Sequence, residues 1–315
     1  MALLEVRPDG LYCAAGDFYV DPWGPVARAV ITHAHSDHAC PGSASYLTAA
    51  AGGALLRARI GDDAAIQTVP YGGPLTIGDA KVSLHPAGHI LGSSQVRIEL
   101  AGEVWVVSGD YKLAADPTCA PFEPLRCHGF VTESTFGLPI FRWAPEADAV
   151  AAIHDWWRGN IAAKKTSVLY AYPLGKAQRV LAMLDLSIGA VWAHDSVERY
   201  SAAYREQGIA IPPQGTREGA SLIVAPPGYE HRGRVSTALV SGWMRIRGTR
   251  RRRSLDRGFV LSDHADWPEL LRAIDATNAE TVWVTHGFRA PLVRWLQERG
   301  RDAIATEGRW EGGES

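Results

Sequence analysis

One short segment near the N-terminus concentrates side chains that bind metal ions. Three imidazoles and one carboxylate follow directly after an apolar run typical of a strand: His33, His35, Asp37 and His38. Such nitrogen and oxygen donors suit zinc and the neighbouring first-row transition metals. The alternative is a polar loop whose histidines are only solvated, but so dense a cluster seldom arises by accident. The segment therefore predicts a metal-chelating loop at a strand end.

Three further residues with metal-binding side chains share one setting, each beside a glycine at the end of a predicted strand: His89, Asp110 and His286. A loop at such a position can deliver its side chain into a pocket shared with other loops. A single residue of this kind is often without function, but the repeated setting favours convergence. We therefore expect all three to lie near the histidine-rich loop.

The elements that must position these residues change in character along the chain. The first half is predicted to form short strands and turns, with strands at 10–13, 17–20, 29–32, 82–84, 96–100, 104–108 and 129–132. From residue 144 onward, helices (145–158, 175–184, 197–207) alternate with strands (168–172, 190–192, 222–225). This alternation predicts a separate α/β unit with a parallel sheet. Strands 258–261 and 281–285 and helices 267–276 and 290–299 complete the chain.

Composition narrows the class of protein. A chain of 315 residues with a net charge of −2 has room for one large or two smaller domains, and its bulk charge gives no reason to expect a polyanionic partner. The four cysteines form no CxxC pair and are interpreted as reduced thiols. We see neither a secretory signal nor an apolar run of membrane-spanning length, so a cytoplasmic protein without a membrane partner is predicted.

The order of the candidate ligands resembles the metallo-β-lactamase superfamily, in which an HxHxDH motif precedes the later ligands. This resemblance implies an α/β fold, an αββα sandwich, with two divalent ions (Zn²⁺ or Mn²⁺) at one edge. One ion would be held by His33, His35 and His89, the other by Asp37, His38 and His286, and Asp110 would bridge them. Asp21 matches the aspartate of the family's first motif, which supports the ligand loop without binding metal.

The late motifs resemble one branch of that superfamily, the β-CASP nucleases. Asp110 and His286 lie 176 residues apart, far more than the glyoxalase II and lactamase branches require. Segments TESTFG with Glu133, LSDHAD with His264 and VTHG with His286 resemble the branch's motifs A, B and C. The resemblance implies a metallo-β-lactamase core, residues 1–143 and 251–315, with an inserted β-CASP domain at 144–250.

Within this branch the chain is similar to the bacterial ligase-associated DNA exonucleases. That similarity implies a DNA exonuclease of DNA repair that acts on single-stranded or end-containing DNA, in association with an ATP-dependent DNA ligase. A hydroxide held between two metals would attack the phosphodiester, and Asp37 would orient it. His264 would donate the proton to the leaving group, and Glu133 would hold His264 protonated. The alternative interpretation of His264 is a cap for the helix that begins near residue 267.

Basic residues provide a predicted nucleic-acid surface. Seven arginines fall between residues 245 and 257, and the named candidates for phosphate contact are Arg247, Arg250 and Arg251, with Lys176 at a predicted helix start. A solvated loop is the alternative for the arginines, and a plain surface lysine for Lys176. Trp243 is the tryptophan expected to stack on bases, whereas His194 and His231 are assigned no role.

Three other functions remain open. The same machinery could process RNA as an exo- or endoribonuclease, because both nucleic acids present the same phosphate. A two-metal site could instead hydrolyse a small thioester or lactam, although an inserted domain and an arginine cluster argue against it. A metal-free scaffold is the third alternative, but such proteins lose ligands, and here every ligand position is filled.

Overall fold

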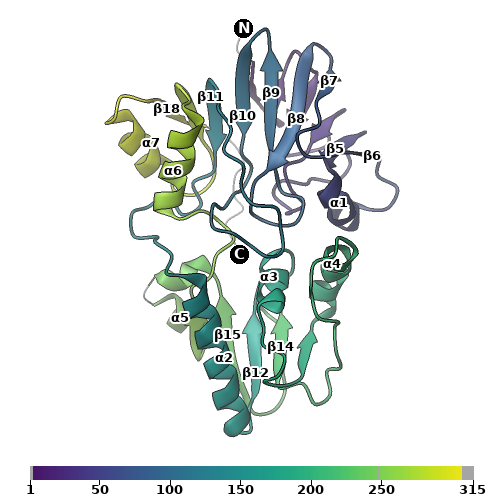
Figure 1. The fold of residues 1–315 in the computed structure, drawn as a ribbon, viewed down its shortest axis with the longest axis vertical. Helices are drawn as coiled ribbons and strands as arrows, with labels where there is room; N and C mark the ends of the chain where they lie inside the picture. The colour runs from purple at the N-terminus through teal and green to yellow at the C-terminus, as the bar shows by residue number, and fades with distance from the viewer. Residues whose placement is uncertain (1–2, 247, 307–315) are drawn as a thin grey trace. The chain divides into compact units, whose positions relative to one another are not determined.

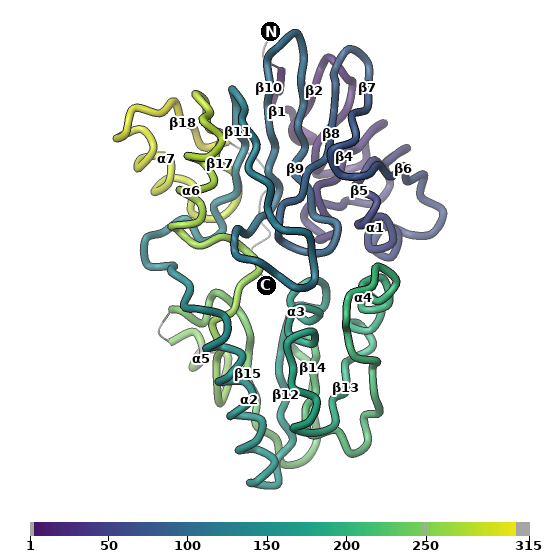
Figure 2. Tube along the Cα trace, viewed as in Figure 1, coloured from purple at the N-terminus to yellow at the C-terminus, as the bar shows by residue number. Residues whose placement is uncertain are grey.

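The computed structural model describes residues 3–246 and 248–306, without the side chains of Arg250 and Arg252. The chain forms two compact units, one from the residues up to Ile140 together with those from His264 onward, the other from Phe141–Asp263. Figure 2 shows the chain leaving the first unit in teal, building the second in teal to green and returning to the first in yellow.

Two sheets form the first unit. The six-stranded sheet has the order β1 (Glu5–Arg7), β2 (Gly10–Cys13), β3 (Phe18–Val20), β4 (Ala29–Val30), β5 (Tyr46–Ala49) and β6 (Ile66–Val69), and is parallel from β3 onward. The seven-stranded sheet has the order β18 (Asp302–Ala305), β17 (Thr281–Val284), β11 (Gly129–Thr132), β10 (Glu103–Val107), β9 (Ser94–Leu100), β8 (Ala80–Pro86) and β7 (Leu75–Ile77).

The alternation of side chains along β10 explains how the layers pack. Trp105 and Val107 join the hydrophobic cluster that includes Leu11 and Val30 of the other sheet. Successive strand residues point to opposite faces, so Val104 and Val106 pack instead with α6 (Trp267–Thr277) and α7 (Arg289–Gln297). Helix α1 (Gly53–Ile60), preceded by the short helix η1 (Ala50–Gly52), packs on the outer face of the six-stranded sheet. Helices thus cover the outer face of each sheet, as Figure 1 shows.

The second unit is a parallel α/β sheet, as the alternation of strands and helices predicts. Its strand order is β13 (Val191–Ala193), β14 (Leu222–Ala225), β12 (Thr166–Tyr170), β15 (Val235–Val240) and β16 (Arg257–Phe259), and all four pairings are parallel. Its helices are α2 (Glu146–Ala162), α3 (Lys176–Ala182), α4 (Asp195–Glu206), η2 (Gly242–Arg245) and α5 (Thr249–Arg252).

Strand β16 shows where the second unit ends. The sequence pattern places it in the closing part of the core, after a boundary at residue 250. It pairs instead with β15, with Leu239 opposite Gly258, so the second unit extends to Asp263. Neither β15 nor the pairing of β16 is predicted by the sequence, because strand pairing depends on residues far away in the chain. Among the described residues, no helix is both long and apolar enough to cross a membrane.

Candidate metal centre

Asp21 organises the histidine-rich loop. This buried side chain follows β3, and its Oδ1 accepts a hydrogen bond from the Thr32 N–H at 2.8 Å. Its Oδ2 accepts from the Thr32 hydroxyl at 2.6 Å and lies 2.7 Å from Nδ1 of His38. Since a carboxylate only accepts, Nδ1 of His38 carries a proton and Nε2 faces away from Asp21. Asp21 itself has a φ of 45°, a backbone conformation that is uncommon for residues other than glycine.

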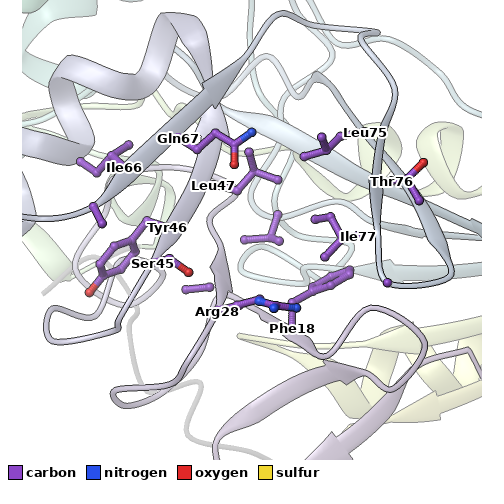
Figure 3. A pocket seen from close by; sticks show the side chains of 14 residues that line it. Phe18, Arg28, Ser45, Tyr46, Leu47, Ile66, Gln67, Leu75, Thr76 and Ile77 are labelled. Carbon is purple, nitrogen blue, oxygen red and sulfur yellow. The ribbon is translucent and has the colours of Figure 1, made fainter.

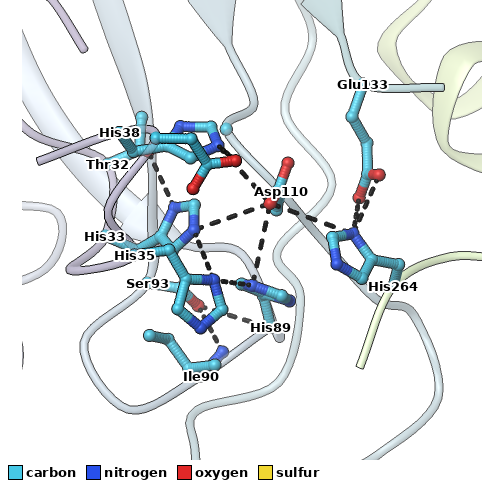
Figure 4. Close-up of polar contacts among 12 residues, drawn as sticks. Thr32, His33, His35, His38, His89, Ile90, Ser93, Asp110, Glu133 and His264 are labelled. Atoms are coloured by element: carbon cyan, nitrogen blue, oxygen red, sulfur yellow. Dashed lines mark hydrogen bonds and ion pairs between the residues drawn. The ribbon is translucent and has the colours of Figure 1, made fainter. Parts of the chain in front are cut away.

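Four of the predicted ligands converge to form the first candidate metal site. The ligand atoms of His33, His35, His89 and Asp110 all lie within 4.8 Å of one another, and all four residues are buried. Nδ1 of His35 is 3.1 Å from Nε2 of both His33 and His89. Figure 4 shows the three rings directed toward one point beside Asp110.

The other predicted ligands form a second group. Asp37, His38 and His286 also place their ligand atoms within 4.8 Å of one another. His286 lies two residues after the end of β17 and has a φ of 47°, and its Nδ1 lies 2.9 Å from the Thr285 hydroxyl. That hydroxyl donates to the Thr132 carbonyl, which ties the His286 loop to the end of β11. The strained backbone therefore directs the imidazole toward the loop of His38.

Asp110 lies at the centre of both groups. Its Oδ2 is 3.5 Å from Nε2 of His33, 3.4 Å from Nε2 of His38 and 3.8 Å from Nε2 of His89. Burial alone would raise the pKa of Asp110, but the charges of His38 and His264 outweigh burial and hold that pKa well below its usual value. An ionised carboxylate among imidazoles is the arrangement expected of a bridging ligand.

The position of Asp110 depends on a glycine. Gly109 has a φ of 56°, and a Cβ at this position would lie 2.6 Å from the Thr32 hydroxyl oxygen. Any side chain there would collide with the ligand loop while also straining the backbone. The glycine lets the end of β10 approach the loop closely enough for Asp110 to reach its histidines.

The titration behaviour of two of the histidines, His33 and His286, fits metal ligation. Burial, and then the neighbouring His38, hold the pKa of His33 well below its usual value. The same causes lower the pKa of His286 to about 4. Burial also opposes charge on His38, but Asp110, Asp37 and Asp21 together raise the pKa of His38 well above its usual value. Neutral imidazoles such as His33 and His286 have a lone pair available for a metal.

The donor set fits divalent metal ions. It consists of imidazole nitrogens and carboxylate oxygens, which suit Zn²⁺ and Mn²⁺. Two buried atoms, His38 Nε2 and Asp110 Oδ1, make no hydrogen bond within the described residues. Buried polar atoms normally have partners, so these two atoms fit a role as metal ligands. The buried histidine and aspartate clusters could therefore bind metal ions.

His264 and Glu133 form a pair beside Asp110. Nδ1 of His264 is 3.0 Å from Oε2 of Glu133 and 3.9 Å from Oδ2 of Asp110 (Figure 4). The other oxygen of Glu133 accepts from the Tyr111 N–H at 2.8 Å, which fixes the carboxyl group. Burial raises the pKa of Glu133, and the charge of His264 opposes that rise. Helix α6 is capped by Asp266, not by His264, so the alternative interpretation of His264 as a helix cap is wrong.

Ser93 is a supporting residue that sequence reasoning missed. Its hydroxyl accepts hydrogen bonds from the N–H groups of His89 and Ile90, at 3.1 and 3.2 Å. These bonds close the turn that carries His89, as Figure 4 shows. A serine four residues after a predicted ligand, in a glycine-flanked turn, is the signal that would have found it.

The predicted nucleic-acid contacts lie in the second unit. Lys176 is buried, with its Nζ 3.0 Å from Oδ1 of Asp263, so a phosphate contact would require it to leave this carboxylate. Arg251 is exposed. Arg247 and the side chain of Arg250 lie outside the described part of the chain. Trp243 is half-buried, with its ring 5.6 Å from that of Phe141.

A separate hollow of about 610 Å³ opens between β4, β5, β6 and β7 of the first unit. Figure 3 shows Leu47, Ile66, Leu75 and Ile77 around it, with the polar side chains of Arg28 and Gln67. None of the predicted metal ligands lines this hollow. It therefore plays no part in the metal centre.

Comparison with known proteins relates the chain to enzymes of nucleic-acid metabolism. It is 34% identical over 309 residues to a "Probable DNA ligase" of Opitutus terrae, a match that covers 94% of this chain and 30% of the ligase. It is 28% identical over 123 residues to "Endoribonuclease ysh1" of Aspergillus fumigatus and 28% identical over 122 residues to "Endoribonuclease YSH1" of Saccharomyces cerevisiae. Each match covers 38% of this chain, and 14% and 15% of the respective endoribonuclease. The chain thus spans less than a third of each relative.

The fold has a counterpart among solved structures. A protein of unknown function from Enterococcus faecalis V583 superposes with a TM-score of 0.59 over 90% of this chain and 79% of the other, at 12% sequence identity. This likeness shows the α/β fold alone. No protein-family model matches the chain.

Proposed function

We propose that this chain is a two-metal phosphodiesterase, a nuclease of the β-CASP branch of the metallo-β-lactamase superfamily. The observation that carries the proposal is Oδ2 of Asp110, which lies within 3.9 Å of nitrogens of His33, His38, His89 and His264. The layers of the first unit, helix on sheet on sheet on helix, match the αββα sandwich that the motif order implies. The unit Phe141–Asp263, with its parallel sheet, would be the inserted domain of that branch.

Two divalent ions, Zn²⁺ or Mn²⁺, would supply a water of lowered pKa and positive charge facing the phosphate oxygens. His33, His35 and His89 would hold one ion, Asp37, His38 and His286 the other, and Asp110 both. Asp21 fixes the protonation of His38, so that Nε2 is directed at the site. Asp37, which is half-buried, would orient the attacking water.

His264 is the proposed proton donor. A leaving alkoxide needs a proton, and a positioned general acid contributes roughly 10²–10⁴-fold to the rate. Glu133 lies 3.0 Å from Nδ1 of His264, which orients the ring and favours its protonated form. The proton therefore leaves from Nε2, the ring nitrogen that does not face Glu133.

DNA is the proposed substrate. The match to the probable DNA ligase covers 94% of this chain, whereas each match to an endoribonuclease covers 38%. We therefore favour a DNA exonuclease of DNA repair that acts beside an ATP-dependent DNA ligase. An RNA-processing nuclease is the second candidate, which the endoribonuclease matches support.

One experiment tests the proposal. Purified protein is assayed for metal content, and then on matched 5′- and 3′-labelled DNA and RNA strands with Zn²⁺ or Mn²⁺, beside a chromogenic lactam. We expect about two ions per chain and stepwise shortening of DNA that stops with a chelator. Cleavage of RNA at internal positions would favour the second candidate. Hydrolysis of the lactam without cleavage of either strand would refute a nuclease.

A further inference from the structure

A cluster of rings and one arginine lies on the second unit, and we name it the Trp192 cluster: Trp192, His194, Arg217, Tyr229 and His231. The ring of Tyr229 is 6.0 Å from that of Trp192 and 5.4 Å from that of His194. Cζ of Arg217 lies 5.8 Å from the ring centroids of both Trp192 and Tyr229. One exposed guanidinium therefore lies over two aromatic rings at once.

The cluster belongs to one face of the parallel sheet. Trp192 of β13 and Tyr229, which follows β14, pack with Val168 of β12 and Ile223 of β14. The Tyr170 hydroxyl donates to the Tyr229 carbonyl at 2.9 Å and fixes the backbone there. The rings are thus held by the sheet, while Arg217, on a loop, is exposed. If the guanidinium of Arg217 moved away, another planar group could stack on these rings in its place.

Two polar atoms of the cluster lack partners. The Tyr229 hydroxyl and Nδ1 of His231 are buried and make no hydrogen bond within the described residues. Native proteins leave few buried polar atoms without a hydrogen bond, so each of these two atoms is expected to bind a water or a ligand. Burial, and then the charge of Arg217, lower the pKa of His231. A neutral imidazole and a hydroxyl can each donate or accept a hydrogen bond.

We propose that the Trp192 cluster binds an unstacked base of single-stranded nucleic acid. The inference rests on the proposed nuclease function and narrows its substrate to strands whose bases are free. Movement of Arg217 would uncover the faces of Trp192 and Tyr229, on which a base can stack. The edge of the base carries donors and acceptors to match the Tyr229 hydroxyl and His231 Nδ1, and the displaced Arg217 can pair with a phosphate.

The local charge favours stacking over a purely ionic contact. Arg217, Arg232 and Arg234 are exposed, but so are Glu218 and Glu230. This near balance gives a polyanion modest attraction, so affinity must come largely from the rings. A duplex keeps the faces of its bases stacked inside the helix and cannot offer one without unpairing. The cluster therefore selects single strands.

The test measures binding without catalysis. Metal-free protein in chelator is titrated with fluorescent oligothymidylate, with an abasic strand of equal length and with a duplex. Wild type should prefer oligothymidylate over the abasic strand by roughly 5- to 150-fold, the range for stacking of one base. Tyr229→Leu should lose most of that preference, because it removes a ring. Arg217→Ala should keep or increase the preference, because it uncovers the rings and both strands carry the phosphates that Arg217 could pair with. Arg199→Ala is the matched control, because Arg199 lies 5.7 Å over Tyr200 in the same unit but outside the cluster.

The outcomes separate this inference from the proposed function. Metal-loaded wild type is assayed in parallel on bis(p-nitrophenyl) phosphate, which has no nucleobase. If it binds no metal and leaves this ester intact, the proposed function is wrong. If it cleaves the ester while Tyr229→Leu keeps the full preference for oligothymidylate, or Arg217→Ala loses it, or wild type shows none, the inference is overturned. Arg217 is exposed, so its variant decides the matter even if Tyr229→Leu does not fold.

Discussion

Asp21→Asn tests whether Asp21, which is not a predicted metal ligand, determines which nitrogen of His38 is available to a metal ion. Asp21 accepts three hydrogen bonds, from the Thr32 N–H, the Thr32 hydroxyl and Nδ1 of His38. An asparagine of the same shape can keep its oxygen on the Thr32 N–H, but its NH₂ then faces the other two groups. The Thr32 hydroxyl can turn to accept, whereas Nδ1 of His38 can accept only if the proton moves to Nε2.

That proton would block the metal-binding nitrogen. A His38 protonated on Nε2 has no lone pair for the second ion, so we expect its affinity to fall by roughly 10–100-fold, as is usual when a supporting residue is removed. The substitution also replaces hydrogen bonds to a charged carboxylate with hydrogen bonds to a neutral amide. Each replacement should cost about 1 kcal/mol, so the unfolding free energy of the metal-free protein should fall by about 1–3 kcal/mol. Ions held by His33, His35 and His89 should bind almost as in wild type.

The assay is a competition titration of each ion against a chromophoric chelator, with thermal unfolding of the metal-free protein beside it. Asp116→Asn is the control. Oδ1 of this buried aspartate accepts hydrogen bonds from the N–H and the hydroxyl of Thr118, at 2.7 and 2.6 Å. Its carboxylate thus holds a nearby threonine, as the carboxylate of Asp21 holds Thr32. It should leave both affinities unchanged. Wild-type affinity at both sites in Asp21→Asn would refute the reasoning, because His38 Nε2 would then not be a ligand.

Three further predictions concern Asp110, His264 and the arginines of the second unit. Asp110→Ala should abolish cleavage and reduce bound metal from about two ions per chain, and a variant with two tight ions and normal rates would remove Asp110 from the centre. His264→Ala should keep both metals yet cleave DNA roughly 10²–10⁴-fold more slowly, with a much smaller effect on a nitrophenyl ester, whose leaving group needs no proton; equal effects on both substrates would make His264 structural. The double variant Arg251→Glu with Arg253→Glu should weaken binding of single-stranded DNA. The slope of log affinity against log salt should fall by about 0.7 for each phosphate that the protein no longer neutralises. An unchanged slope would show that this arginine run is a solvated loop.

Much of the site follows from local sequence. His33, His35, Asp37 and His38 lie within one short loop, so their proximity needs no knowledge of the fold. Strands β2, β11 and β14 have the bounds that their apolar runs predict, because a buried strand flanked by glycine and polar residues is a local pattern. The alternation of helices and strands likewise identifies a parallel sheet.

What only the tertiary structure decides is which distant groups meet and in which state. The three bonds of Asp21, the nitrogens around Asp110 and the pairing of Lys176 with Asp263 join residues far apart in sequence. The end of the second unit depends on the pairing of β16 with β15, and the Trp192 cluster on a loop folding over a sheet face. Burial and neighbouring charge then set the pKa of His38 and His286 in opposite directions. These effects of burial and charge arise only when folding has brought the groups together, so no local sequence pattern predicts them.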